Sequence, residues 1–257
     1  MINFSKYCIL FLVLAIPLII SYFYMSRSLL WIVLYFLFFL TGLVFGSINI
    51  CSCFYIKTMC KGNSDINAIS LTFDDGPDQN ITPKVLKILK KHNVKACFFC
   101  IGKNAETNKE LLKQINEEGH IIGNHGYSHS LWFDLFSLKK MKSEILNADN
   151  LIFDIINKRT KFFRPPYGVT NPTLAKVIKT TGLISVGWSL RSLDTTAKGN
   201  TGKILKRLEK IKAGDIVLFH DNISEIPEIL EKFIELVKFK NIKFARLDDL
   251  LNCKAYE

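Results

Sequence analysis

Two long apolar runs near the N-terminus constrain the fold more than any other feature of the sequence. Residues 8–24 and 29–46 are almost entirely apolar, and each is close to the length that crosses the hydrocarbon core of a bilayer. Only Met25-Ser-Arg-Ser28 separates them, so a tight helical hairpin is expected. Neither run has a polar face, which argues against a buried hairpin in a soluble protein. No small-residue cleavage site precedes the second run, which argues against a removed signal peptide. We therefore predict a membrane anchor within residues 1–60 and a multi-pass protein of the plasma or inner membrane.

Two spans would place the rest of the chain on the same side of the membrane as the N-terminus. The flanking charges are Lys6, Arg27, Lys57 and Lys61, and their distribution leans toward a cytoplasmic position for both ends. The difference in charge is small, so the side is left open.

The chain has 257 residues and a net charge of +11, which is enough length for one domain with a full core plus additional segments. The charge favours anionic surroundings such as lipid headgroups, phosphorylated glycans or nucleic acid, or it reflects lysines on a solvated surface. No nucleic-acid motif and no basic stripe with interleaved aromatic residues is present, so no nucleic-acid partner is expected.

The seven cysteines are odd in number and irregular in spacing, which does not describe a disulfide framework. Cys97 and Cys100 lie in an apolar stretch that is typical of a strand, where their odd spacing places them on opposite faces. We interpret them as small core residues rather than a metal or redox pair. Cys51 and Cys53 adjoin the predicted membrane segment, and we interpret them as ordinary residues rather than acylation sites.

From Asn67 onward, short apolar strands alternate with amphipathic helical patterns, which predicts a parallel sheet or barrel. In such folds the catalytic groups gather at the carboxyl ends of the strands. The expected strands are 68–73, 96–101, 121–124, 184–188, 216–220 and 242–245, and the expected helices are 82–92, 106–118, 137–157, 172–181, 201–212 and 226–239.

Polar motifs follow several of these strands at the same end. His125 and His129 are four residues apart, so one helical turn would bring both imidazoles to one side. Each motif alone is weak, since a D-D-G is often a turn and a strand-ending histidine is often a core group. Their shared position at strand ends predicts one site. The motifs are Thr72-Phe-Asp-Asp-Gly-Pro77, Gly123-Asn-His-Gly-Tyr-Ser-His129, Phe163-Arg-Pro-Pro-Tyr-Gly168, Trp188-Ser189 and Leu218-Phe-His-Asp221.

The residue types suit metal-assisted amide hydrolysis. Two histidines and one carboxylate can hold a divalent ion while leaving positions open for water and substrate. The ion lowers the pKa of its water and polarises a carbonyl. A second carboxylate can accept the proton of the water, and a separate histidine can protonate the leaving nitrogen.

These motifs resemble those of the NodB-type polysaccharide deacetylases, carbohydrate esterase family 4, over about residues 69–245. The resemblance implies an α/β fold, a distorted (β/α) barrel, in a NodB-like domain over residues 67–250, preceded by the transmembrane hairpin. It also implies a divalent metal ion, with Zn²⁺ favoured and Co²⁺ or another divalent ion as alternatives.

The same resemblance implies a role for each matched residue. By that match Asp74 is the general base, which Arg164 orients, and His220 is the general acid, whose pKa Asp194 tunes. The metal ligands are Asp75, His125 and His129, and the substrate contacts are the Tyr167 backbone N–H at the oxyanion, Leu218 against the acetyl methyl, and Trp188 at the pocket wall.

Three positions depart from the family pattern. Gly126 stands where the second motif usually has a Ser or Thr that braces the loop. In the fourth motif, Arg191 replaces an Asp and Thr195 replaces a Trp. Trp188 and Trp132 are the candidates for the missing aromatic wall, and the departures concern substrate preference more than catalysis.

The leading hypothesis is a hydrolase that removes N-acetyl groups from the amino sugars of a polysaccharide or cell-envelope glycan. A second hypothesis keeps the chemistry but takes a lipid-linked, polyprenyl phosphate amino sugar as the substrate for deacetylation or deformylation. A third is a catalytically inactive, membrane-bound carbohydrate-binding module. The expected partners are the glycan or lipid-linked sugar and the membrane.

Overall fold

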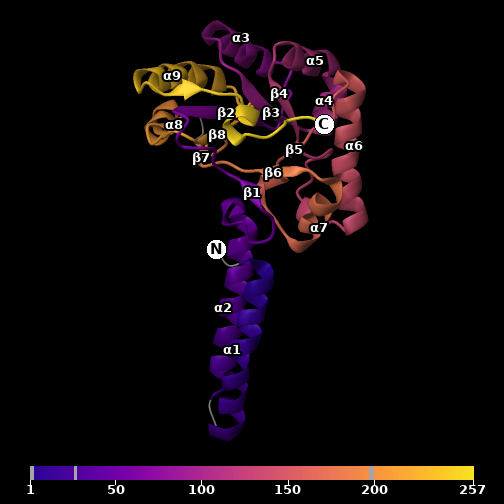
Figure 1. Ribbon diagram of the computed structural model, residues 1–257, viewed down its shortest axis with the longest axis vertical. Coiled ribbons are helices and arrows are strands. Elements are labelled where there is room, and N and C mark those ends of the chain that lie inside the picture. Colours follow the sequence, from indigo (N-terminus) through magenta and orange to yellow (C-terminus); the bar gives the residue numbers. More distant parts are fainter. Residues whose placement is uncertain (1–2, 26–27, 197–199) are drawn as a thin grey trace.

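The two apolar runs form a pair of antiparallel helices that projects from an α/β domain (Figure 1). The computed structural model describes residues 3–25, 28–196 and 200–257. Arg27, one of the charges that flank the apolar runs, lies outside the described residues. Helices α1 (Phe4–Met25) and α2 (Leu29–Ile48) pack along their length. Tyr7 stacks on Phe39, and the Tyr35 hydroxyl donates to the carbonyl of Phe11 at 2.6 Å.

Both helices have the length and composition of membrane spans. Their mean hydropathies are 2.3 over Phe4–Tyr24 and 2.4 over Leu29–Ile48, and almost none of this surface is covered by the rest of the protein. The expected helical hairpin is confirmed. Signal sequences share this length and composition, so the two helices alone do not establish a membrane anchor.

The segment that follows α2 is fastened to the α/β domain. The carbonyl of Ser47 accepts a hydrogen bond from the Thr170 N–H at 3.0 Å. Cys51 and Cys60 form a disulfide, although the number and spacing of the cysteines did not indicate a disulfide framework, so the interpretation of Cys51 as an ordinary residue is wrong. A nine-residue separation among irregularly placed cysteines gives no periodic signal, and it is the fold that brings the two sulfur atoms together. Cys53 is a free thiol.

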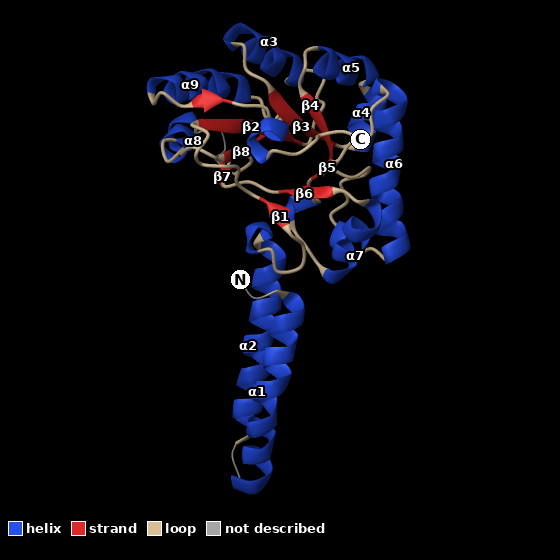
Figure 2. Ribbon diagram, viewed as in Figure 1, coloured by secondary structure: helices blue, strands red, loops and turns tan. Residues whose placement is uncertain are grey.

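Among the described residues, nine strands form a sheet whose order is β1-β6-β5-β4-β3-β2-β8-β7, with β9 paired to the start of β2. Every ladder between these strands is parallel, so their carboxyl ends meet at one side (Figure 2). The alternating pattern predicts a parallel sheet or barrel, and the parallel sheet is confirmed. The strands are β1 Thr58–Met59, β2 Ala68–Asp74, β3 Ala96–Cys100, β4 Ile121–Asn124, β5 Phe162–Phe163, β6 Ile184–Val186, β7 Leu190–Arg191, β8 Ile216–His220 and β9 Lys243–Phe244.

Amphipathic helices cover the sheet. Helix α7 shows the local logic, because the Asn171 side chain caps its N-terminus by accepting from the Leu174 N–H, and Gly182 ends it with φ of 68°. The helices of the domain are α3 Thr82–His92, α4 Gly102–Thr107, α5 Lys109–Glu117, α6 Leu138–Ile156, α7 Pro172–Thr181, α8 Thr201–Leu208, α9 Ile226–Phe239 and α10 Leu247–Leu251.

Most expected elements are confirmed, and the differences are local. The expected helix 106–118 is two helices, α4 and α5, and the expected helix 201–212 ends at Leu208. The expected strand 184–188 ends at Val186, which leaves Trp188 in a loop. The two-residue strands β1, β5 and β7 were not expected, because so short a segment has no periodicity to recognise.

The placement of Cys97 and Cys100 on opposite faces of β3 is confirmed. Cys97 packs in the cluster with Phe99 and Phe162, whereas Cys100 packs in the larger cluster with Phe98. Both side chains are fully buried, and burial raises the pKa of each thiol well above its usual range. They are inert core residues.

Candidate active site

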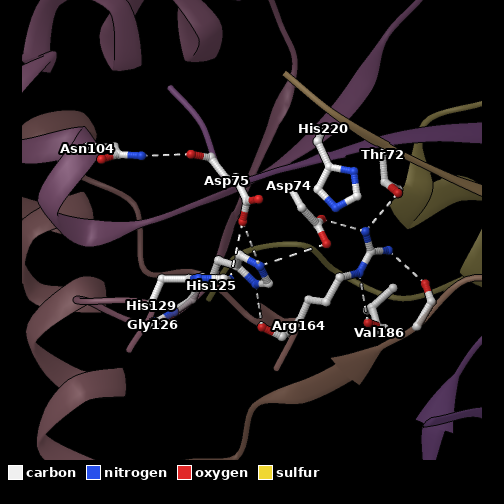
Figure 3. A network of polar contacts seen from close by, with 12 residues as sticks. Thr72, Asp74, Asp75, Asn104, His125, Gly126, His129, Arg164, Val186 and His220 are labelled. Atoms are coloured by element: carbon white, nitrogen blue, oxygen red, sulfur yellow. Dashed lines mark hydrogen bonds and ion pairs between the residues drawn. The ribbon is translucent and has the colours of Figure 1, made fainter. Parts of the chain in front are cut away.

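Asp74 and Asp75 face one pocket although they are adjacent in sequence. Successive residues of a strand normally point to opposite sides, but Asp75 has φ of 74°, which turns its side chain toward that of Asp74. The pocket has a volume of about 220 Å³ and lies at the carboxyl ends of the strands (Figure 3). It is lined by Asp74, Asp75, His125, His129, Tyr167, Gly168, Trp188, Arg191, Thr195, Leu218 and His220.

Asp75, His125 and His129 converge as the sequence predicts for metal ligands. One potential ligand atom from each lies within 4.8 Å of the others. Asp75 Oδ1 is 3.5 Å from His125 Nε2 and 3.3 Å from His129 Nε2. A cluster of two imidazoles and one carboxylate around a common point is a donor set that Zn²⁺ and related ions bind.

The two imidazoles meet by a different route from the helical turn that the spacing suggested. Residues 125–129 form an irregular loop in which Gly126 has φ of 77° and His129 has φ of 48°. The ring centroids of His125 and His129 are 4.9 Å apart. Left-handed backbone at both positions coils the loop back on itself, and glycine adopts that conformation without strain.

Charge and hydrogen bonding prepare these groups to bind a cation. Burial alone would raise the pKa of Asp75, but the neighbouring histidines hold it at about 2, so the carboxylate is ionised. The carbonyl of Arg164 lies 2.7 Å from His125 Nδ1, which must therefore carry the proton. His125 Nε2 is left to face Asp75 and His129, the arrangement that orients a metal-binding imidazole.

Arg164 is fully buried, and each of its three guanidinium nitrogens donates to a protein acceptor. Its Nη1 donates to Asp74 Oδ1 at 2.7 Å and to Thr72 Oγ1 at 2.9 Å. Its Nε and Nη2 donate to the carbonyls of Val186 and Gly187. This network fixes one face of the Asp74 carboxylate and supplies its counter-charge.

His220 lies at the end of β8, in register with Asp74 of β2, and is held by Asp194. Asp194 Oδ1 lies 2.7 Å from His220 Nδ1, and Oδ2 accepts from the His220 backbone N–H at 2.8 Å. Burial disfavours the protonated ring, but the hydrogen bond and negative charge of Asp194 outweigh it and raise the pKa of His220. The ring is thereby kept as a proton donor beside the carboxylates.

Comparison with known proteins identifies a family that matches this chain. Residues 61–186 match the polysaccharide deacetylase family model. A peptidoglycan-N-acetylglucosamine deacetylase of Bacillus cereus is 35% identical over 205 residues, which are 78% of this chain and 94% of that protein. The chain belongs to the polysaccharide deacetylase family. The expected family and enzyme class are therefore confirmed.

Two further relatives agree. A peptidoglycan-N-acetylmuramic acid deacetylase of Bacillus subtilis is 33% identical over 196 residues, which cover 74% of this chain and 73% of the relative. The crystal structure of a peptidoglycan N-acetylglucosamine deacetylase in complex with 4-naphthalen-1-yl-N-oxidanyl-benzamide has a TM-score of 0.73 and 31% identity, covering 78% of this chain and 95% of that one. The expected NodB-like distorted barrel is confirmed by this likeness, and it is a half-barrel of parallel strands.

An aromatic side chain lines the deacetylase pocket although the Trp of the fourth motif is replaced by Thr195. Trp188 lines the pocket, and its ring lies so close to Gly168 that a Cβ there would overlap it. Trp132 is 67% exposed and does not line the pocket, so of the two candidate tryptophans only Trp188 is in place. Tyr167 and Leu218 also line the pocket, as the motifs indicated, and so do the two unusual residues, Arg191 and Thr195.

Other residues support the deacetylase site without a signal that the sequence could have revealed. The Asn104 side chain donates to the carbonyl of Asp75 at 2.7 Å. Glu144 of α6 accepts from both the N–H and the hydroxyl of Ser128 at 2.8 and 2.7 Å, and so braces the histidine loop. Asp221 belongs to a motif, but its supporting role was not indicated: it is fully buried, accepts from the Thr82 hydroxyl and abuts Gly76. Each lies far in sequence from the group that it supports.

Proposed function

We propose that this protein is a metal-dependent hydrolase that removes N-acetyl groups from the amino sugars of a cell-envelope glycan. The observation that carries the proposal is the single pocket that joins three kinds of group. These are the Asp75, His125 and His129 cluster, the Asp74 carboxylate paired with Arg164, and the His220–Asp194 pair.

A divalent ion held by Asp75, His125 and His129 would supply Lewis acidity at the scissile carbonyl and lower the pKa of the attacking water. Zn²⁺ is the ion we favour for this donor set, with Co²⁺ or another divalent ion as alternatives. Metal binding would displace any proton on the imidazoles, since only neutral histidine is a ligand.

The remaining residues divide the proton transfers between them. Asp74 accepts the proton of the attacking water, and the hydrogen bond from Arg164 holds that carboxylate in the required orientation. The backbone N–H of Tyr167 stabilises the developing oxyanion. His220, kept protonated by Asp194, gives its proton to the departing sugar nitrogen, while Leu218 contacts the acetyl methyl.

The relatives indicate the class of glycan. Those described above act on N-acetylglucosamine and N-acetylmuramic acid of peptidoglycan. We infer that this chain acts on a glycan of the same kind.

We also propose that α1 and α2 anchor the enzyme in a membrane as two spans, so that residues 1–60 are the anchor and residues 67–250 the deacetylase domain. The apolar surface of the two helices supports this, because little of it is covered by the protein. The Cys51–Cys60 disulfide lies just after α2 and is typical of the oxidising side of a membrane. We give it more weight than the small charge difference between the flanks, and it supports the proposal that the deacetylase domain lies outside the cytoplasm.

A lipid-linked amino sugar is the second candidate substrate. The observation that favours it is the contact between the end of α2 and the pocket loops. The Gly46 and Ser47 carbonyls accept from the hydroxyl and N–H of Thr170, two residues after Gly168 of the pocket. An inactive sugar-binding module is disfavoured, since all the groups required for catalysis are assembled in one pocket.

Release of acetate tests the proposal directly. The full chain in detergent, loaded with Zn²⁺ or Co²⁺, is assayed for acetate and formate on chito-oligomers, peptidoglycan and lipid-linked amino sugars. We expect acetate release that a chelator abolishes and added metal restores. Protein that binds no divalent ion and stays inactive after metal addition would favour the binding module instead. A reporter fused after Glu257 tests the proposed side of the membrane.

A further inference from the structure

Arg191 places a positive charge in the wall of the deacetylase pocket. It lies in β7, where its backbone pairs in register with Leu218 of β8. Both residues line the pocket, together with Trp188 and His220. The Arg191 side chain therefore stands beside the groups that would surround a bound acetamide.

The guanidinium of Arg191 has no protein acceptor among the described residues. It donates no hydrogen bond to them, no carboxylate of theirs lies within ion-pair distance, and its buried Nε has no partner. The guanidinium lies over the ring of Trp188, whose centroid is 5.8 Å from the Arg191 Cζ. Buried polar groups of a folded protein normally have partners, so an unpaired arginine in a pocket points to a ligand.

The contrast with Arg164 shows that the unpaired state of Arg191 is particular to its position. Arg164 is fully buried and donates to Asp74, Thr72 and two backbone carbonyls. Since Asp74 already has its counter-charge in Arg164, Arg191 is not needed to neutralise the catalytic carboxylate. Its charge is available to a substrate.

The neighbouring position provides room for a bulky anion. Thr195 is exposed at the rim of the same pocket and carries a small side chain where the deacetylase motif has Trp. Thus, relative to the family motif, Arg191 replaces an acidic residue and Thr195 replaces a large aromatic ring with a small hydroxyl side chain. The two changes are complementary, because they add positive charge and open the space in front of it.

We propose that Arg191 binds an anionic group, a carboxylate or a phosphate, on the amino sugar whose acetamide is hydrolysed. This rests on the proposed deacetylase function and narrows its substrate class to acidic N-acetylated sugars. The planar guanidinium can bind either oxyanion through two parallel hydrogen bonds. The carboxylate would belong to a muramic-acid-type sugar, and the phosphate to a lipid-linked or otherwise phosphorylated sugar.

The first test compares specificity constants on three substrates that share the acetamide. These are a neutral chito-oligomer, a glycan fragment containing N-acetylmuramic acid, and N-acetylglucosamine bearing a 1-phosphate. We expect wild-type kcat/KM to be at least about tenfold higher on one acidic substrate than on the neutral one. Arg191→Met lowers kcat/KM on that substrate about ten- to a hundredfold and changes the neutral one by less than about threefold.

Arg191→Lys retains the charge and is expected to lose less than Arg191→Met. Lys232→Met, on the exposed side of α9, serves as the control for a lost positive charge far from the pocket. The arm that loses activity identifies the anion as carboxylate or phosphate. Equal losses on all three substrates, or no loss on either acidic one, would overturn the proposal.

A binding measurement separates this inference from the proposed function. In the Asp74→Asn background, calorimetry compares the Kd for each acidic sugar with and without Arg191→Met. A loss of affinity of about tenfold or more confined to an acidic sugar supports the role of Arg191 even when no acetate is released from any substrate. Unchanged affinity for both acidic sugars rejects that role even when the deacetylase is active.

Discussion

At the residue scale, Asp74 and Arg164 form a buried ion pair in which Arg164 Nη1 lies 2.7 Å from Asp74 Oδ1, so each side chain provides the counter-charge of the other. Asp74→Asn keeps the shape and one hydrogen-bond acceptor but removes the base. We expect kcat to fall about 10²- to 10⁴-fold, the range for loss of a general base, with bound metal unchanged. Acetate release and metal content by mass spectrometry check this, with the exposed Asp65→Asn as control. Full activity of Asp74→Asn would refute the assigned role.

The Asp194–His220 pair makes a prediction about pH. His220 acts as an acid, so activity is lost as pH rises through its pKa, and the raised pKa extends the active range upward. In Asp194→Asn, burial remains while the negative charge is gone, so the pKa of His220 falls. We expect the alkaline limb of the kcat/KM profile to move to lower pH. An alkaline limb that stays in place would assign the limb to another group.

At the element scale, helix α6 holds the loop of residues 125–129 in place, because Glu144 of the helix accepts two hydrogen bonds from Ser128 of the loop. Glu144→Ala frees the loop, so metal affinity is expected to fall about tenfold or more, as for other outer partners of metal ligands. Competition with a chelator measures the affinity. Glu110→Ala removes an exposed glutamate paired with Lys113 and is the control, with no change expected. Equal affinities in the two variants would exclude the bracing role.

Two glycines with nearly the same backbone conformation provide a matched test of the aromatic wall. Gly168 and Gly182 have φ of 69° and 68°, but a Cβ at Gly168 would overlap the Trp188 ring, whereas nothing lies within 4 Å of one at Gly182. Gly182→Ala is expected to cost about 1 kcal/mol of unfolding free energy from the left-handed backbone alone. Gly168→Ala is expected to cost more and also to raise KM, because it displaces Trp188. Urea denaturation and steady-state kinetics provide the comparison, and equal effects at the two sites would contradict it.

The sequence predicts long elements well and short ones poorly. Helices such as Thr82–His92 and strands such as Ile216–His220 have several apolar residues at a fixed period, and both match the structure. Strand Leu190–Arg191 is too short for a period and is defined by its pairing with β8. The loop from His125 to His129 was expected to be a helical turn, because spacing alone does not report the sign of φ.

At the scale of the whole molecule, motif residues were predictable and their supports were not. Adjacent polar residues at strand ends identified Asp74, Asp75 and the histidines, and the parallel sheet brings them together. Glu144 and Asn104 are ordinary surface-type residues in the sequence, and only the packing of distant elements gives them a role. The same holds for the Cys51–Cys60 pair.

The disulfide makes a prediction about the stability of the whole chain. It closes a loop across a separation of nine residues, for which the chain-entropy account gives about 2–3 kcal/mol. We expect Cys51→Ala with Cys60→Ala to lower the unfolding free energy by that amount, and reduction of the wild type to do the same. Thermal unfolding with and without reductant checks this, and Cys53→Ala is the single-thiol control. A melting temperature insensitive to reductant would contradict the pairing.

The carbonyls of Gly46 and Ser47 are hydrogen-bonded to Thr170, and Cys51 is bonded to Cys60, so the end of α2 is fastened close to the pocket loops. This attachment limits the distance from the membrane at which the enzyme can act. Along this path no flexible spacer separates the last turn of α2 from the pocket wall. With the hairpin in a bilayer, the pocket would travel sideways with the lipid but stay at one height above it. Such an enzyme would meet glycan strands as they pass close to the membrane surface, and older layers farther out would lie beyond its range.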